Sequence, residues 1–499
     1  MGVFKLVSLT LNKHNLPPSP ALKFPIIGHL YILKEHIHRT LENLSEKYGP
    51  IFSLQLGKRL AVVVSSPSSV KECFTKNDVV LADRPPLMIG GYNCTTIIDS
   101  CYGDHWRNLR RICALEILSV TSLNKSQTIR QFEVKHLLHK LFQNCNDFGT
   151  IFELKSKFTE LSFNVIMRMV SGDGFFDQDK GKAVYFRELI DEFFSNGGAS
   201  NVDDFLPVPF GWIYKFIKKN ALTQLGKKLD EFLQDLIDEY RGVIVIGGTD
   251  TTAVTIEWAM THLLNHPQVL NKVRIEIDTH VGFDRLVNES DLPNLKYLQS
   301  IISETFRLSP AAPMLIPHQS ADDTKIGGFD VPRGTILLVN AWAVHRDPLV
   351  WADDPGSFRP ERFEGIKVKP WELLPFGMGR RTCPGAGLAQ RVIALAVGTL
   401  VQCFEWEIVS KDSDIAEGSA INTFEGDIGL NPEVTNNLST KDVQAHWEGR
   451  RAILKLEFTY AYKKGDDNHP KKINAKEGKI HLSILSYPLT CDCPRSTTL

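Results

Sequence analysis

The stretch FGMGRRTCPGAG, residues 376–387, decides what kind of protein this chain forms. It places Cys383 in a glycine-rich loop directly before an apolar segment that is expected to be a helix. Loop amides and a helix N-terminus both favour negative charge, and Arg380 and Arg381 add positive potential. Such surroundings stabilise a thiolate, which serves as a metal ligand or as a nucleophile. The alternative is a buried, inert cysteine, the usual state of a free thiol.

The composition sets the class of protein around this loop. The chain has 499 residues, of which 43% are hydrophobic and 23% charged, so a globular protein with a large core is expected. Lys and Arg number 57 and Asp and Glu 58, which argues against a nucleic-acid partner bound through bulk positive charge. The nine cysteines lack the spacing of a disulfide framework, which indicates a reducing compartment.

The periodicity of apolar residues predicts a mainly α chain with small β-sheets, the α+β class. Alternating, Val-rich residues 51–66 and Gly-punctuated residues 322–340 predict strands, whereas most of 103–308 has helical spacing. Residues 345–382 form a long, Pro-rich, irregular stretch, which inside a compact domain is usually functional.

Three parts follow along the chain. Residues 1–15 are expected to be a degenerate N-terminus without a membrane anchor, since this stretch is too short and too polar to span. Residues 16–418 are expected to form one large domain. Residues 419–499 are polar and predict a C-terminal extension of unknown fold, in which ILKLEFTYAY is a candidate strand.

The loop motif Phe376-x-x-Gly379-x-Arg381-x-Cys383-x-Gly385 resembles the haem-binding signature of the cytochrome P-450 family. The resemblance implies that Cys383 is the metal ligand, the axial thiolate on the iron of haem b. It implies that Phe376 and the loop amides shield the sulfur, that Gly379 and Gly385 shape the loop, and that Arg381 pairs with a haem propionate.

Other motifs occur in the order that the family has. Trp106 and Arg110, in HWRNLRR, resemble a propionate-binding pair, and His318 resembles a further propionate contact, with a polar loop histidine as the alternative. Glu304 and Arg307 have the spacing of a common surface ion pair. The resemblance instead implies a buried structural triad that Arg362 of PERF completes and that holds residues 345–382 under the haem.

The segment GGTDTT, residues 247–252, is expected on the oxygen side of the haem. Two glycines inside a helix are unfavourable by roughly 1 kcal/mol each and need a reason. The resemblance supplies one: space for dioxygen, with Thr251 and Asp250 as the catalytic residues that manage protons. A helix start, with Thr249 or Asp250 as N-cap, is the alternative.

The resemblance runs from about residue 16 to 418 and is closest to plant microsomal hydroxylases of isoflavonoids and related phenolics. It implies a cytochrome P-450 fold and monooxygenase activity on a small hydrophobic substrate with O2. Electrons are expected from an NADPH-dependent flavoprotein reductase, since the sequence has no convincing dinucleotide-binding unit. It also implies the cytosolic face of the endoplasmic reticulum membrane, although without an anchor a peripheral or cytosolic location stays open.

The sequence departs from the family at the segment before GGTDTT. LIDEYR runs straight into GVIVIGGTDTT, so a helix of the family and the first half of the oxygen-side helix are expected to be deleted. The remaining helix is predicted over 243–265, beginning about Gly242. A haem-binding but catalytically inactive homologue therefore stays open. A product without haem and a haem-thiolate isomerase or dehydratase are further alternatives.

Overall fold

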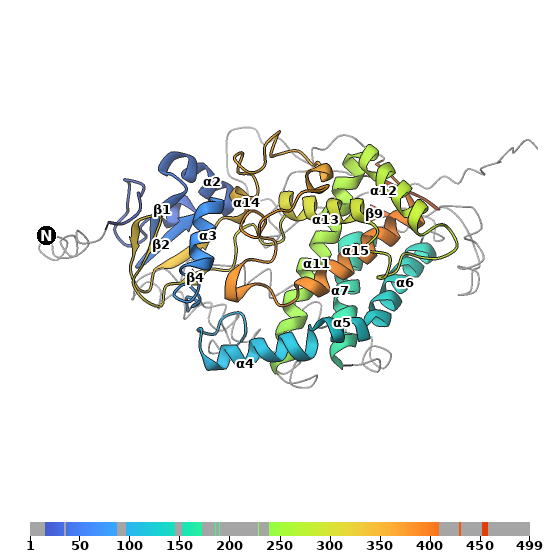
Figure 1. Ribbon diagram of the computed structural model, residues 1–499, viewed down its shortest axis with the longest axis horizontal. Helices are drawn as coiled ribbons and strands as arrows, with labels where there is room; N and C mark the ends of the chain where they lie inside the picture. Colours follow the sequence, from blue (N-terminus) through green and yellow to red (C-terminus); the bar gives the residue numbers. More distant parts are fainter. Residues whose placement is uncertain are drawn as a thin grey trace, which may run out of the picture.

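The computed structural model describes residues 15–33, 36–86, 96–144, 152–171 and 239–408, positions 185, 189 and 228, and two short strands at 429–430 and 452–457. A sheet-containing end and a larger helical end lie side by side (Figure 1). The predicted α+β class is confirmed. Residues 1–14 lie outside the described residues, as do most of 172–238, which precede the junction where the deletion is expected.

The helices make up about half of the described residues. The N-terminal half contains α2 (Ile37–Tyr48), α3 (Pro67–Thr75), α4 (Asp104–Ile112), α5 (Val120–Lys125), α6 (Gln127–Asn144) and α7 (Leu154–Ser171). The C-terminal half contains α11 (Glu239–Asn265), α12 (Pro267–His280), α13 (Lys296–Leu308), α14 (Ala341–Val344) and α15 (Ala386–Cys403). Short 3-10 helices lie at η1 (Leu30–Ile32), η4 (Pro360–Phe363) and η5 (Gly379–Arg381), and a π-helical turn lies at η2 (Cys113–Ile117).

The main sheet has the order β1-β2-β7-β4. Its strands are β1 (Ile51–Leu56), β2 (Arg59–Val64), β4 (His318–Gln319) and β7 (Ile336–Val339). The first two pair antiparallel, and β7 joins β2 in parallel with Val62 opposite Leu337. A separate hairpin joins β5 (Thr324–Ile326) and β6 (Phe329–Val331). The predicted strands of 51–66 and 322–340 are confirmed.

A third sheet has the order β3-β9-β10-β8. It joins β3 (Phe152–Glu153), β8 (Phe404–Ile408), β9 (Gly429–Leu430) and β10 (Ala452–Glu457). The strand expected in ILKLEFTYAY is therefore present as β10, which pairs in parallel with β8. In this way the C-terminal extension contributes strands next to the helical core.

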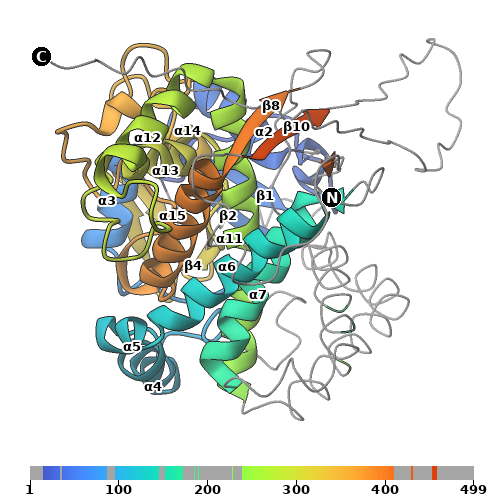
Figure 2. The ribbon, with the colours of Figure 1, turned by 90° about the vertical axis from the view of Figure 1, so that its right-hand side faces the viewer.

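The core lies around α15, which packs against α6, α11, α12 and α13 (Figures 1 and 2). From Val392 to Cys403 every residue of α15 is buried. Among the described helices, α15 alone is long and apolar enough to cross a membrane, and 72% of it is buried inside the protein. Since Cys383 lies three residues before this helix, the core fixes one end of the cysteine loop.

Helix α11 begins earlier than the sequence predicted. It starts at Glu239 rather than about Gly242, and its 27 residues span roughly 40 Å. The predicted start was wrong because helical geometry already holds from Glu239 and continues through the glycine pair. Asp250 therefore lies well inside the helix, which excludes the alternative in which it is an N-cap.

Candidate active site

The Cys383 loop is closed by backbone hydrogen bonds. The Cys383 amide donates to the Phe376 carbonyl at 2.8 Å, and the Thr382 amide donates to the Gly379 carbonyl at 3.1 Å. Phe376 itself packs edge-on against Phe306 of α13, with ring centroids 5.1 Å apart. The loop thus returns on itself directly before α15, whose N-terminus begins at Ala386.

The Cys383 thiol has opposing influences on its pKa. Desolvation by the surrounding protein raises the pKa above its ordinary value, although the residue is exposed. Hydrogen bonds from the amides of Gly385 and Ala386 and the charge of Arg110 act in the opposite direction. A bound metal cation deprotonates such a thiol outright, so the sulfur and its two amide donors suit an iron ligand.

Gly379 occupies a position that no other residue fits. Its φ is +74°, and a Cβ added there would lie 2.3 Å from Oδ1 of Asp78. The same carboxylate accepts a hydrogen bond from the Arg380 amide at 3.0 Å and forms an ion pair with the Arg380 side chain. Asp78 therefore holds the loop against α3, a role that no sequence motif indicated.

Replacing Gly379 with alanine is expected to destabilise the protein by about 2–3 kcal/mol, from the left-handed backbone and the clash with Asp78. Gly365→Ala is the matched control, because Gly365 has a φ of +71° but nothing within 4 Å of the added Cβ. The control should lose only about 1 kcal/mol. Urea unfolding of both variants measures the difference, and equal losses would show that the contact with Asp78 is unimportant.

Three arginines surround the loop without carboxylate partners. Arg381 donates to the carbonyls of Ala82, Ile97 and Ser100, and Arg110 donates to the Thr382 carbonyl at 2.5 Å. Arg84, which the sequence analysis did not single out, donates to the carbonyls of residues 98, 316 and 317. Within the described part of the chain, none of the three forms an ion pair at 4.0 Å or less.

The electrostatics of this cluster favour an anionic ligand. Burial, followed by the neighbouring charge of Arg381, lowers the pKa of Arg84 to about 9. Burial likewise lowers the pKa of Arg381 to about 10 and that of Arg110 below its usual value. The charges of Asp83 and Asp99 act on Arg381, and that of Asp99 on Arg84, but neither carboxylate forms an ion pair with them within 4.0 Å. Guanidinium groups that are hydrogen-bonded to carbonyls and form no such ion pair can bind an acid group bidentately. The haem propionates are such groups, so the residues present fit the cofactor.

Trp106 and His318 complete the cluster. Trp106 is buried, its Nε1 donates to the Ile97 carbonyl at 3.0 Å, and the Arg381 guanidinium lies 4.6 Å from its ring centroid. His318 is also buried, with Nδ1 2.8 Å from the Leu81 carbonyl. Burial and the charge of Arg84 hold its pKa well below the ordinary value, so the imidazole is neutral. His318 is not a polar loop residue.

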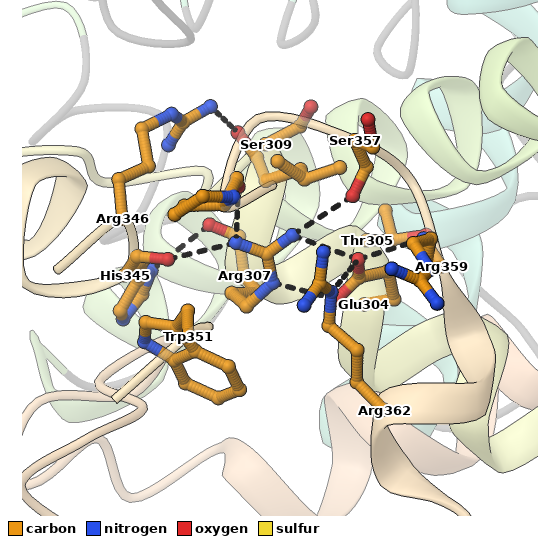
Figure 3. A network of polar contacts seen from close by, with 12 residues as sticks. Glu304, Thr305, Arg307, Ser309, His345, Arg346, Trp351, Ser357, Arg359 and Arg362 are labelled. Atoms are coloured by element: carbon orange, nitrogen blue, oxygen red, sulfur yellow. Dashed lines mark hydrogen bonds and ion pairs between the residues drawn. The ribbon is translucent and has the colours of Figure 1, made fainter. Parts of the chain in front are cut away.

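Glu304, Arg307 and Arg362 come together in one network of polar contacts (Figure 3). Glu304 and Arg307 are fully buried and form two hydrogen bonds, of 2.6 and 2.8 Å, while Arg362 lies 3.5 Å from the same carboxylate. Glu304 and Arg307 are thus not a surface ion pair, the alternative that their spacing left open, but part of a buried network.

The two arginines of this network bind the irregular segment. Arg307 donates to the carbonyls of His345, Pro355 and Ser357, and Arg362 donates to those of residues 352, 353 and 354. Glu304 also accepts a hydrogen bond from the Arg359 amide at 2.8 Å. Residues 345–359 are therefore held to α13 by the buried Arg307 and to η4 by the partly buried Arg362, rather than by secondary structure.

The glycine pair of α11 has two different surroundings. A Cβ at Gly248 would lie 2.5 Å from Cδ1 of Ile166, so close packing against α7 explains this glycine. A Cβ at Gly247 would meet nothing within 4 Å, so packing does not explain that one. Thr251 is exposed, and its hydroxyl donates to the Gly247 carbonyl at 2.8 Å. Asp250 precedes it on the same helix and is half-buried.

Comparison with known proteins identifies the fold and its chemistry. The family model described as "Cytochrome P450" matches residues 17–245 and 216–425. Cytochrome P450 81Q32 of Catharanthus roseus is 52% identical over 456 positions, covering 84% of this chain and 91% of that protein. Isoflavone 2'-hydroxylase of Glycyrrhiza echinata is 44% identical, covering 83% and 91%. A zebrafish cytochrome P450 structure with progesterone has a TM-score of 0.61 at 29% identity, covering 73% and 91%.

The alignment with the Catharanthus roseus protein also contains a gap. It spans 456 positions, but 84% of 499 residues is about 419, so about 37 positions have no counterpart in this chain. The two family-model matches meet at residues 216–245, the segment in which the sequence analysis expects a deletion. These matches cover most of the chain: it belongs to the cytochrome P450 family of haem-thiolate monooxygenases.

Proposed function

We propose that Cys383 is the axial thiolate ligand of haem b and that the enzyme hydroxylates a small hydrophobic plant phenolic. The observation that carries the proposal is a thiol with two amide donors beside three arginines that have no carboxylate partner. Haem has the complementary groups, an iron that takes a thiolate and two propionates that take guanidinium groups. When bound, it supplies dioxygen activation for R–H + O2 + 2e⁻ + 2H⁺ → R–OH + H2O.

The residues around the loop hold the cofactor in different ways. Arg110 and Arg381 bind the propionates, Trp106 orients Arg381 by stacking, and neutral His318 lies behind the cluster. Phe376, Gly379 and Gly385 shape the loop so that amides rather than side chains face the sulfur. The triad of Glu304, Arg307 and Arg362 acts at a distance by fixing the segment that leads into the loop.

Thr251 and Asp250 handle protons on the oxygen side. The Thr251 hydroxyl donates its own proton to the Gly247 carbonyl, so its oxygen can accept a hydrogen bond from a bound group. Asp250, on the same helix, would supply protons to this hydroxyl. The open space at Gly247 is where a small molecule fits beside the helix.

Thr251→Val is expected to lower product formation roughly a hundredfold, because valine keeps the shape and removes the proton-handling hydroxyl. Thr251→Ser should retain most of the activity. Thr279→Val is the matched control, since the Thr279 hydroxyl makes the same bond to a carbonyl four residues earlier on exposed α12. Product is measured per NADPH consumed. Equal product yields for the two valine variants would remove Thr251 from the proton path.

The substrate class rests on the relatives. Two of them are named isoflavone 2'-hydroxylase and isoflavone 3'-hydroxylase, and a third is named (+)-piperitol/(+)-sesamin synthase. Two of the three names specify an isoflavone, so an isoflavone is the first substrate to test.

The partner is an NADPH-dependent flavoprotein reductase, as is typical of the family, and the expected location is the cytosolic face of the endoplasmic reticulum membrane. The first experiment combines the purified protein, haem, this reductase, NADPH and an isoflavone under ¹⁸O2. A hydroxylated product that carries one ¹⁸O atom supports the proposal.

A second candidate follows from the gap of about 37 positions in the alignment. A chain that lacks part of the oxygen side would bind haem without turning substrate over. Haem uptake with a thiolate spectrum but no labelled product would favour this inactive homologue. A protein that takes up no haem would contradict both candidates.

A further inference from the structure

His345 lies between the buried ion pair and the cysteine loop, and it belongs to neither motif. It follows α14 directly and is fully buried (Figure 3). Its Nδ1 lies 3.2 Å from the Arg307 carbonyl, and its Nε2 lies 2.7 Å from the Leu374 amide nitrogen. Both partners are backbone groups, one on α13 and the other two residues before Phe376.

These partners assign the protonation state of the ring. A carbonyl oxygen can only accept, so Nδ1 carries the hydrogen; an amide N–H can only donate, so Nε2 carries none. A charged imidazolium would therefore leave the Leu374 amide without its acceptor. In agreement with this, burial, Arg346 and Arg307 lower the pKa of His345 to about 3.

The hydrogen bonds continue from the imidazole to the cysteine. The Leu374 carbonyl accepts from the Gly377 amide at 3.1 Å, and the Phe376 carbonyl accepts from the Cys383 amide at 2.8 Å. On the other side, Arg307 donates to the His345 carbonyl at 2.9 Å while Glu304 holds its guanidinium. A path of hydrogen bonds and backbone thus joins Glu304 to Cys383 through one ring, and it is buried from Glu304 to Leu374.

We propose that His345 is a positioning residue of the cysteine loop, whose neutral imidazole fixes the start of the loop at Leu374 to α13. The role of the loop as a haem ligand rests on the proposed function. The two hydrogen bonds by which His345 joins Arg307 to Leu374, the His345 bridge, are a property of the folded chain alone. Without the ring, the Glu304–Arg307 pair would still hold residues 345–359, but residues 374–383 would lose their link to it.

Two substitutions separate the two ends of the bridge. Glutamine reaches as far as Nε2 and can offer its carbonyl oxygen to the Leu374 amide. Asparagine ends near the position of Nδ1, so it can still donate to the Arg307 carbonyl but does not reach Leu374. Both remove the aromatic ring, which makes H345Q the matched control for H345N.

The test is hydrogen–deuterium exchange of the purified full chain, read on the peptides that contain residues 374–383. H345N should raise their exchange rate about tenfold over the wild type, the effect of one lost buried hydrogen bond. H345Q should stay close to the wild type, and peptides from β1 and β2 should change in neither variant. Equal exchange of residues 374–383 in H345N and H345Q would overturn the proposal, as would faster exchange in all peptides.

A second readout links the bridge to the cofactor. In the reduced protein with carbon monoxide, H345N should lose the thiolate-type Soret band several-fold faster than the wild type or H345Q. A retained band in H345N at the wild-type rate would overturn the positioning role. If the wild type has no such band, the proposed function fails, and the exchange measurement still decides whether His345 holds the loop.

Discussion

Glu304→Gln is expected to lower the free energy of unfolding by about 3–5 kcal/mol and to deplete bound haem, one of the two largest effects that we expect. The substitution leaves the Arg307 guanidinium buried without its counter-charge, which costs more than the pair contributes when intact. Both side chains of the pair have 0% exposure, so solvent cannot compensate. Because Arg307 also binds three carbonyls of residues 345–357, the whole irregular segment should loosen with it.

Glu361→Gln is the matched control for this variant. Glu361 lies on the same PERF turn and forms an ion pair with Lys272, but both side chains are nearly half exposed, at 46% and 47%. Exposed pairs contribute about 1 kcal/mol or less, so the control should keep its stability and its haem. Urea unfolding and the haem-to-protein ratio measure both effects. If E304Q were as stable as E361Q, the network would not hold the segment.

Lowering the pH from 7 to 5 is expected to destabilise the protein by on the order of 5 kcal/mol. His38, His318 and His345 are each at most 4% exposed and neutral. Burial lowers the pKa of His38 to about 4 and that of His345 to about 3, and it holds the pKa of His318 well below its ordinary value. In the unfolded chain these histidines bind protons near pH 6.5, whereas in the folded chain they stay neutral to a lower pH. The free energy of unfolding therefore falls as the pH drops below 6.5.

One neighbouring group acts with the opposite sign. Burial raises the pKa of Glu42, so its contribution is present at low pH and is lost as the pH rises. This offsets part of the effect of His38 on the same helix. Melting temperatures by circular dichroism at pH 7, 6 and 5 test the prediction.

Two variants test the assignment to buried histidines. His38→Gln should weaken the pH dependence by up to about 1.4 kcal/mol per pH unit, the share of one proton. His280→Gln, at an exposed position on α12, should leave it unchanged. A melting temperature that stays constant between pH 7 and 5 would contradict the prediction.

The fold was largely predictable from periodicity and from the cysteine motif. The strands of residues 51–64 and 324–339 and the helices from Pro267 to Leu308 follow from alternation, helical spacing and proline positions. The start of α11 was not, because the deletion expected directly before Gly242 placed it too late in the chain. A glycine pair inside a helix is also unfavourable by propensity alone. In the structure, the nearby Ile166 side chain leaves no room for a Cβ at position 248, which explains Gly248. That contact cannot be read from the sequence.

The site was predictable only where a motif has a fixed spacing. Cys383, Arg381 and Glu304 lie in such motifs, and the structure brings their partners together. Arg84, Asp78 and His345 were missed because each acts on backbone groups far away in the chain, such as the contact between His345 and Leu374. A hydrogen bond to a carbonyl or an amide requires no particular partner residue, so it leaves no pattern in the sequence.

The measurement that tests the central claim most directly is the carbon monoxide difference spectrum of the reduced, purified protein, with Cys383→Ser as its control. We expect a red-shifted, thiolate-type Soret band in the wild type that is lost in the variant. That result would show that the arginine cluster and the cysteine loop assemble a haem-thiolate site in spite of the gap before α11. A band at the position of inactive haem in the wild type, or the same band in both proteins, would contradict it.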